Sequence, residues 1–459
     1  VQVGKTNVLT LPDMDEALAR LASHPAELER IEFEPRTYIE IQPADAAISV
    51  GAAITSFEQL YARLDRWTET GLVSRLRGKA QRPILEWLVV ADGRPDPSIS
   101  YLVGTQFPEL TDELVDVLHT GVPDTYEVSP VEFHPAMAEE FIPSSSTEST
   151  RSTPTPGTNS GDQSSKPYIA GVEYVGQPDR SRDWQTAFAT WTGGPARGGA
   201  RGRRADGGEL RRPGPLAGIV ETLTESEVPV VFQIVAMPLP DWSGQADQYI
   251  QALEEGTAGR FSTLSDLVSP RSAGQRREYT PKQSHRERIQ SIQQRDQGRS
   301  FQVSIRAVAM SRDAPEAADR TARSLVSSLH GMDGSYHEIE GVLRSDGESA
   351  LLGSPRPGWG LYLDLLRRRV APIGYRAWRR RLPLREPFSR GIVTDAAELS
   401  HLCLLNGATL TPDGSRALAS RRGERTALPL PPGTQLARYR GQGMALCMPL
   451  THDRQPYGR

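Results

Sequence analysis

The chain has 459 residues, of which 37% are hydrophobic and 24% are charged, a composition typical of globular domains diluted by loops. This length exceeds one ordinary core and predicts two or three domains. Its 53 basic and 57 acidic residues give a net charge of -4, which excludes a generally basic nucleic-acid-binding surface and restricts any DNA contact to local patches.

Residues 1–141 predict a first α+β module. Apolar residues alternate in four segments, as in strands, and two further segments carry apolar residues at helical spacing. The order is strand, helix, strand, strand, helix, strand, which is that of a ferredoxin-like (βαββαβ) sandwich. The strands are expected at 38–41, 84–90, 99–103 and 125–133. The helical faces consist of Ile54, Phe57, Leu60, Tyr61, Leu64 and Trp67, and of Leu110, Leu114, Val117 and Leu118.

Two polar segments follow. Residues 142–167 are dominated by Ser, Thr, Pro and Gly, and their few apolar residues cannot offset the entropy of ordering, so they predict a disordered linker. Residues 193–215 place arginines among glycines and predict a disordered basic loop inside the next module.

Residues 168–345 repeat the order of the first module, which makes two tandem ferredoxin-like modules the expected fold. Strands are expected at 168–175, 230–236, 301–309 and 336–342, and the insertion at 243–299 is expected to be helical. Residues 346–390 read as a basic helical connector, and residues 391–459 as a short β-rich tail.

Arginines are the candidate binding residues, because they supply nearly all of the positive charge. Clustered arginines can contact phosphates or anionic lipid head groups, but a solvated or acid-paired face beside a core helix is an alternative. The candidates for DNA or partner contact are Arg201, Arg203, Arg204, Arg367, Arg368, Arg369, Arg379, Arg380 and Arg381.

The chain shows no self-contained catalytic motif. Gly4-Lys5-Thr6 matches the end of a phosphate loop, but the glycines that wrap phosphates in such loops do not precede it. Cys403 and Cys447 lie outside C-x-x-C spacing, so we expect buried thiols in a reducing cytoplasm. We therefore predict no catalytic, cofactor-binding or metal-binding residue, and no enzymatic activity for this chain alone.

Four segments carry a resemblance to a known family. The strand at 230–235 reads VVFQIV, and RIQSI at 288–292 is followed by FQVSIRAV at 301–308. The tail includes GIVT at 391–394 and GMALCMPL at 443–450, and the first module has ILEWL at 84–88 before DGRPD at 92–96. Together these segments resemble the amino-terminal, non-motor region of conjugative-transfer or type IV secretion ATPases of the HerA and FtsK class, particularly the halophile branch.

The resemblance implies an assembly and docking region of a DNA-transfer ATPase. ATP and Mg would bind in a motor domain that follows residue 459 or is a separate subunit, and the start at Val1 fits a fragment or a processed product. The implied partners are that motor, other secretion or conjugation components, and further copies in a hexamer. The absence of a long apolar run or signal peptide predicts a cytoplasmic location, at most peripheral to the inner face of a membrane. The alternative is a stand-alone DNA-binding adaptor or scaffold that uses the arginine-rich segments.

Overall fold

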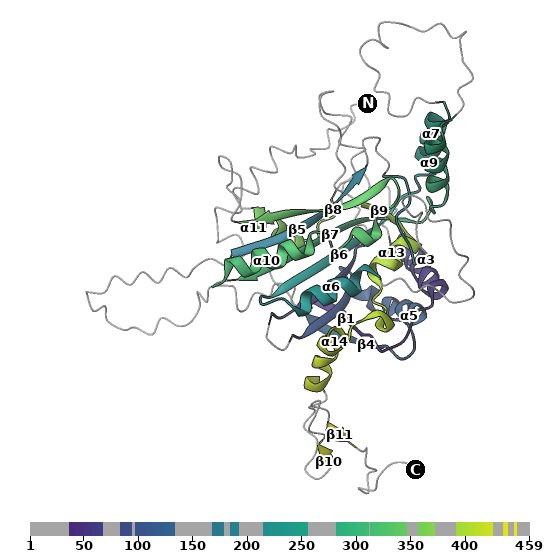
Figure 1. The fold of residues 1–459 in the computed structure, drawn as a ribbon. Helices are drawn as coiled ribbons and strands as arrows, with labels where there is room; N and C mark the ends of the chain where they lie inside the picture. The colour runs from purple at the N-terminus through teal and green to yellow at the C-terminus, as the bar shows by residue number, and fades with distance from the viewer. Residues whose placement is uncertain are drawn as a thin grey trace, which may run out of the picture.

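The computed structural model is an α+β protein built on one nine-stranded antiparallel sheet, which confirms the expected class (Figure 1). The strand order is β4-β1-β3-β2-β6-β7-β5-β8, and β9 pairs with β7 outside this path. The structure describes residues 36–67, 83–93, 97–133, 168–178, 184–191, 214–255, 281–311, 313–346, 357–371, 392–425, 435–438 and 445–447.

The first half of the sheet contains the strands and helices expected from the sequence. α3 forms because its apolar residues recur at helical spacing, and they are buried, as Phe57, Leu60 and Leu64 show. The strands of this half are ordered β4-β1-β3-β2. Its elements are β1 (Arg36–Gln42), α3 (Val50–Trp67), β2 (Leu85–Ala91), β3 (Ile99–Thr105), α5 (Thr111–Gly121) and β4 (Glu127–Phe133).

The second half has the strand order β6-β7-β5-β8 and carries the expected helical insertion. The two insertion helices, α7 and α9, pack on each other and project away from the sheet (Figure 1). A small apolar cluster that includes Trp242, Leu253 and Ile292 holds them together. The elements are β5 (Tyr168–Pro178), α6 (Pro215–Thr224), β6 (Val230–Leu239), α7 (Ser243–Glu254), α9 (Gln283–Gln293), β7 (Ser300–Ser311), α10 (Pro315–Leu325) and β8 (His337–Ser345).

The two halves share one continuous sheet, which the sequence did not lead us to expect. β2 and β6 pair antiparallel from Leu85↔Ala236 to Ala91↔Val230. β2 is buried along its whole length, and β6 is buried over all but two of its residues, Met237 and Leu239. Strands covered on both faces read as nearly continuous apolar runs, as these two do.

The sheet has two different faces. On one face, α3, α5, α6, α10 and α13 cover a large core in which Phe57 stacks on Trp87 with ring centroids 5.7 Å apart. On the other face, α11 (Pro357–Leu366) covers a second core that includes Leu88 and Val90 of β2. Of the connector expected at 346–390, the structure describes residue 346 and residues 357–371. The latter form the apolar, buried helix α11 followed by the basic residues Arg367, Arg368 and Arg369.

Residues 392–425 differ from the β-rich tail that we expected at 391–459. They form β9 (Ile392–Asp395), α13 (Ala396–Cys403) and α14 (Pro412–Arg425), and almost all of residues 392–407 are buried. The reason is local, because Asp395 and Glu398 form a capping box that starts a helix directly after the four-residue strand. This part of the tail completes the sheet and the large core. Farther along, β10 (Gln435–Arg438) and β11 (Ala445–Cys447) form a two-stranded sheet.

Residues 142–167, expected as a linker, and most of the basic loop expected at 193–215 lie outside the described residues. Among the helices that the structure does describe, none is both long and apolar enough to cross a membrane.

Candidate functional site

The predicted arginine contacts separate into two groups. Arg201, Arg203, Arg204, Arg379, Arg380 and Arg381 lie outside the described residues. The triplet at 367–369 follows α11, and its three side chains differ in exposure. Arg367 is exposed, Arg369 is partly buried, and the side chain of Arg368 is only 9% exposed.

Arg368 is an internal ion-pair partner, which fits the acid-paired alternative and not a surface contact. Its Nε lies 2.5 Å from Glu86 Oε2, and Glu86 is fully buried in β2. The physical reason is the backbone at the end of α11, where Arg368 has φ 50, a left-handed conformation that ends the helix. The turn directs its guanidinium onto the sheet.

Glu86 accepts hydrogen bonds from two further residues. The Tyr38 hydroxyl donates to Glu86 Oε2 over 2.8 Å, and the Gln233 side-chain amide donates to Glu86 Oε1. Tyr38 reaches across β3 because Gly104 lies between them without a side chain. A Cβ at Gly104 would lie 2.5 Å from Tyr38 Cδ1. We call Tyr38, Glu86 and Gln233 the arginine socket.

The sequence contained a signal for this socket. Glu86 is the one charged residue in the apolar strand LEWLVVA, and Gln233 interrupts the apolar run of β6. A buried carboxylate requires a partner, so such a residue predicts a distant cation. Burial lowers the pKa of the Arg368 guanidinium, but the Glu86 and Tyr38 contacts outweigh it and leave the pKa raised.

Residues 365–371, which we call the strap, cross the same sheet face and are held by their main chain. Gln233 Nε2 donates to the Leu365 carbonyl over 2.9 Å, and the Arg306 guanidinium donates to the Arg369 carbonyl. Arg306 is itself buried, and burial lowers the pKa of its guanidinium, while Asp364 and Glu173 oppose that shift.

The far end of the strap is held at Ala371. Its carbonyl accepts from Gln302 Nε2 over 2.5 Å, and its N–H donates to Ser304 Oγ over 2.7 Å. Gln302, Ser304 and Arg306 alternate along β7, so all three side chains point to the same face. These contacts use backbone atoms of the strap and do not depend on its side chains.

A second buried polar cluster attaches β9 and α13 to the second half of the structure. Arg295 Nη2 lies 2.7 Å from Glu398 Oε2, and the two side chains are 0% and 1% exposed. Glu398 also accepts from the backbone N–H groups of Phe188 (2.7 Å) and Asp395 (3.0 Å). Burial raises the pKa of the Glu398 carboxyl to about 7, against the lowering effect of Arg295.

Contacts from the first half hold the last residue of α13 and the segment that follows it. The Tyr101 hydroxyl donates to the Cys403 carbonyl over 2.5 Å, and the Gly407 N–H donates to the Tyr126 hydroxyl over 2.6 Å. Cys403 is buried and free, as expected, and burial raises the pKa of its thiol. The second cluster attaches β9 and α13 to the second half, and the Tyr101 and Tyr126 contacts attach the following residues to the first half. We call these contacts together the structural lock.

His337 lies beside this lock and should make the protein sensitive to acid. Its ring centroid is 4.1 Å from that of Phe188, and burial, with the charge of Arg295, lowers its pKa to about 3. Between pH 6.5 and 3 the unfolded chain therefore binds more protons than the folded chain, and His337 costs about 1.4 kcal/mol of stability per pH unit as the pH falls.

We expect His337→Phe to reduce the loss of stability between pH 7 and pH 5 by about 2 kcal/mol, measured by urea unfolding at both pH values. Glu398 acts in the opposite direction, because its raised pKa gives stability that is present below pH 4.5 and lost as the pH rises through 7. Glu398 is present in both the wild type and His337→Phe, so its effect on the pH dependence cancels when the two are compared. An equal pH dependence in the variant and the wild type would contradict the prediction.

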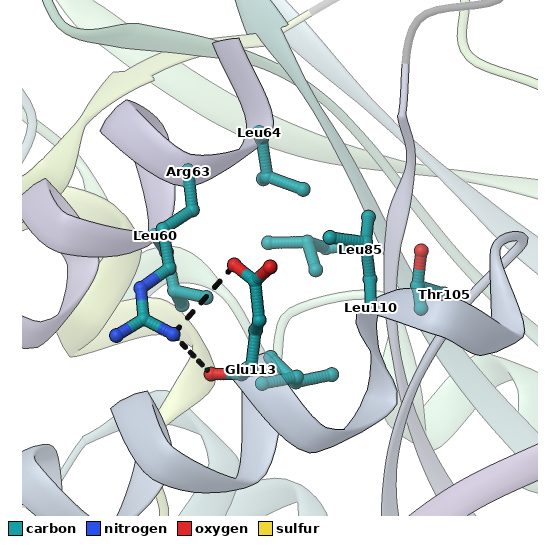
Figure 2. A pocket seen from close by; sticks show the side chains of 8 residues that line it. Leu60, Arg63, Leu64, Leu85, Thr105, Leu110 and Glu113 are labelled. Atoms are coloured by element: carbon teal, nitrogen blue, oxygen red, sulfur yellow. Dashed lines mark hydrogen bonds and ion pairs between the residues drawn. The ribbon is translucent and has the colours of Figure 1, made fainter. Parts of the chain in front are cut away.

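A depression between α3 and α5 is a candidate pocket (Figure 2). Its lining is mostly leucine, and its one arginine, Arg63, is held by Glu113. Arg63 Nη1 donates to the Glu113 carbonyl over 3.0 Å and lies 3.7 Å from its carboxylate. This lining offers neither a glycine-rich loop nor clustered donors for a nucleotide phosphate. The lining residues are Leu60, Arg63, Leu64, Leu85, Thr105, Leu110, Glu113 and Leu114.

The described ranges hold no group of three or more His, Cys, Asp or Glu side chains placed to bind a metal ion. Gly4-Lys5-Thr6 lies outside those ranges. Comparison of the sequence with protein-family models and with curated proteins found no match.

Proposed function

We propose that this chain is the amino-terminal assembly and docking region of a conjugative-transfer ATPase of the HerA and FtsK class. The observation that supports this proposal most is the position of the four segments that carry the resemblance. Apart from the tail stretch at 443–450, which contains β11 of the separate two-stranded sheet, these segments include the strands β2, β6, β7 and β9. These four strands are neighbours in the nine-stranded sheet, in that order. Segments far apart in sequence thus form one contiguous structural unit.

The strand orders support a finer description of the fold. Each half alternates strands and helices as a ferredoxin-like module does, and each has its first and third strands at the centre of its part of the sheet. We infer two ferredoxin-like modules joined through β2 and β6. The position of α14 against both β3 and α6 would place a following domain at the junction of the halves.

In this proposal the chain docks the motor onto its partners, and the motor binds ATP and Mg. The partners are the motor, other secretion or conjugation components and further copies in a hexamer, in the cytoplasm or on the inner face of a membrane. The coding sequence after Arg459 is the direct test. We expect a phosphate loop shortly after it. A sequence without one, in a genome without a separate motor gene of this class, would contradict the proposal.

We predict that the chain alone binds ATP more weakly than micromolar affinity and does not hydrolyse it. The reason is that wrapped backbone amides and a phosphate-loop lysine hold the triphosphate in such motors, and this sequence has no such loop. Titration with a fluorescent ATP analogue and a phosphate-release assay provide the measurement. A variant with Lys5→Ala serves as the control, because turnover that this change abolishes would show that Gly4-Lys5-Thr6 belongs to a working site.

The alternative, a DNA-binding adaptor, is less well supported by the described arginines. Arg368 is paired with Glu86, and Arg369 Nη1 lies 3.1 Å from Asp364 Oδ1, so two of the candidate contacts are already neutralised. DNA affinity that falls steeply with salt in the isolated chain would favour the adaptor.

A further inference from the structure

The arginine socket and the β7 side chains beside it have the composition of a peptide-binding site. Three of the four main-chain contacts to the strap come from β7, and the fourth comes from Gln233 of β6. The socket adds one side-chain requirement, a guanidinium that pairs with Glu86. A segment with one arginine, and with apolar residues in the positions of Leu365 and Leu366, which lie in the second core, satisfies the whole arrangement.

The strap satisfies this site imperfectly. Arg368 takes a left-handed backbone conformation, with φ 50, which is unfavourable for a residue with a side chain. In addition, Gln233 Oε1 is buried and makes no hydrogen bond while its amide nitrogen donates to Glu86 and Leu365. A segment that avoided the strained turn and supplied a donor to Gln233 would fit better than the strap does.

We propose that the strap is an intramolecular occupant of a peptide site, and that an extended, arginine-bearing segment of a partner protein replaces it. The partner's arginine enters the socket of Tyr38, Glu86 and Gln233, and its main chain takes the contacts of Gln302, Ser304 and Arg306. The residue in the position of Ala371 is not proline, because Ser304 Oγ accepts a backbone N–H there. This site does not depend on the proposed function.

The strap competes with any partner because its tether gives it a high effective concentration. Removal of the Arg368 side chain should weaken this competition. A labelled peptide with the sequence of residues 365–371, LLRRRVA, is the probe, and its binding is measured by fluorescence anisotropy. We expect Arg368→Ala to bind it at least about tenfold more tightly than the wild type.

Arg367→Ala is the matched control, since it removes an exposed arginine from the same triplet, and it should bind the peptide as the wild type does. Adding Glu86→Gln to Arg368→Ala should abolish the gain. A peptide with lysine at the central arginine keeps its charge but lacks the planar fork, and it should bind about tenfold more weakly. Equal binding by Arg368→Ala and Arg367→Ala, or a gain that persists with Glu86→Gln, would overturn the proposal.

The wild-type chain provides a second measurement if Arg368→Ala does not fold by circular dichroism. In hydrogen exchange, excess peptide should speed exchange of the strap amides of Arg369 and Ala371, which bond to the Asp364 carbonyl and Ser304 Oγ. The amides of β5 should not change. Unchanged strap amides at peptide concentrations that saturate anisotropy, or an absence of any peptide binding, would also overturn the proposal.

Discussion

Replacement of Glu398 by Gln should lower the free energy of unfolding by about 3–5 kcal/mol. Glu398 and Arg295 form an ion pair with almost no solvent exposure, and Arg295 also donates to the carbonyls of Trp184 and Val393. An arginine cannot lose its proton at accessible pH, so the variant would leave a buried charge without its carboxylate. Urea unfolding at pH 7 measures the loss. Burial raises the pKa of Glu398 to about 7, so the wild type itself loses stability above that pH and the difference from the variant should be smaller at pH 8.

Glu227→Gln is the matched control for this experiment. Glu227 pairs with Arg320 over 3.4 Å, but their side chains are 69% and 68% exposed, so its loss should cost less than about 1 kcal/mol. The double variant Arg295→Met with Glu398→Gln should recover part of the stability, because it removes the buried charge. A loss in Glu398→Gln no larger than that in Glu227→Gln would show that the pair does not stabilise the fold.

The local elements were predictable because their signals lie within a few residues. The alternation in β7 and the helical spacing in α3 depend only on neighbours along the chain, and both elements form as predicted. The pairing of β2 with β6 was not predictable, because the two strands are far apart in the chain and many other edge pairings satisfy the same apolar patterns.

The candidate contacts were less predictable than the fold. The burial of Arg368 could not be predicted, because a run of like charges does not show which of its side chains are exposed. Its buried partner Glu86 lies 282 residues away in the chain. The tail contained a usable local signal, Asp395 followed three residues later by Glu398, which predicts a helix start. The resemblance favoured a β-rich tail in place of this local helix start.

Gly407→Ala should lower the free energy of unfolding by roughly 3 kcal/mol, the upper end of the range for overpacking. Gly407 presses against the first half, where a Cβ would lie 1.8 Å from the Ala44 carbonyl oxygen and 3.1 Å from the Tyr126 hydroxyl. The obstructing atom belongs to the main chain and cannot rotate away, so the segment after α13 must move and weaken its hydrogen bond to Tyr126.

Gly218→Ala is the control for Gly407→Ala, and the two changes add the same methyl group. Gly218 is an exposed position inside α6, and an added Cβ there meets nothing within 4 Å. Because alanine is the better helix former, this variant should be more stable than the wild type by about 0.5–1 kcal/mol. Thermal and urea unfolding of both variants give the comparison, and hydrogen exchange of residues 403–410 should rise only in Gly407→Ala. If Gly407→Ala were as stable as the wild type, residues after Cys403 would not be held against the first half.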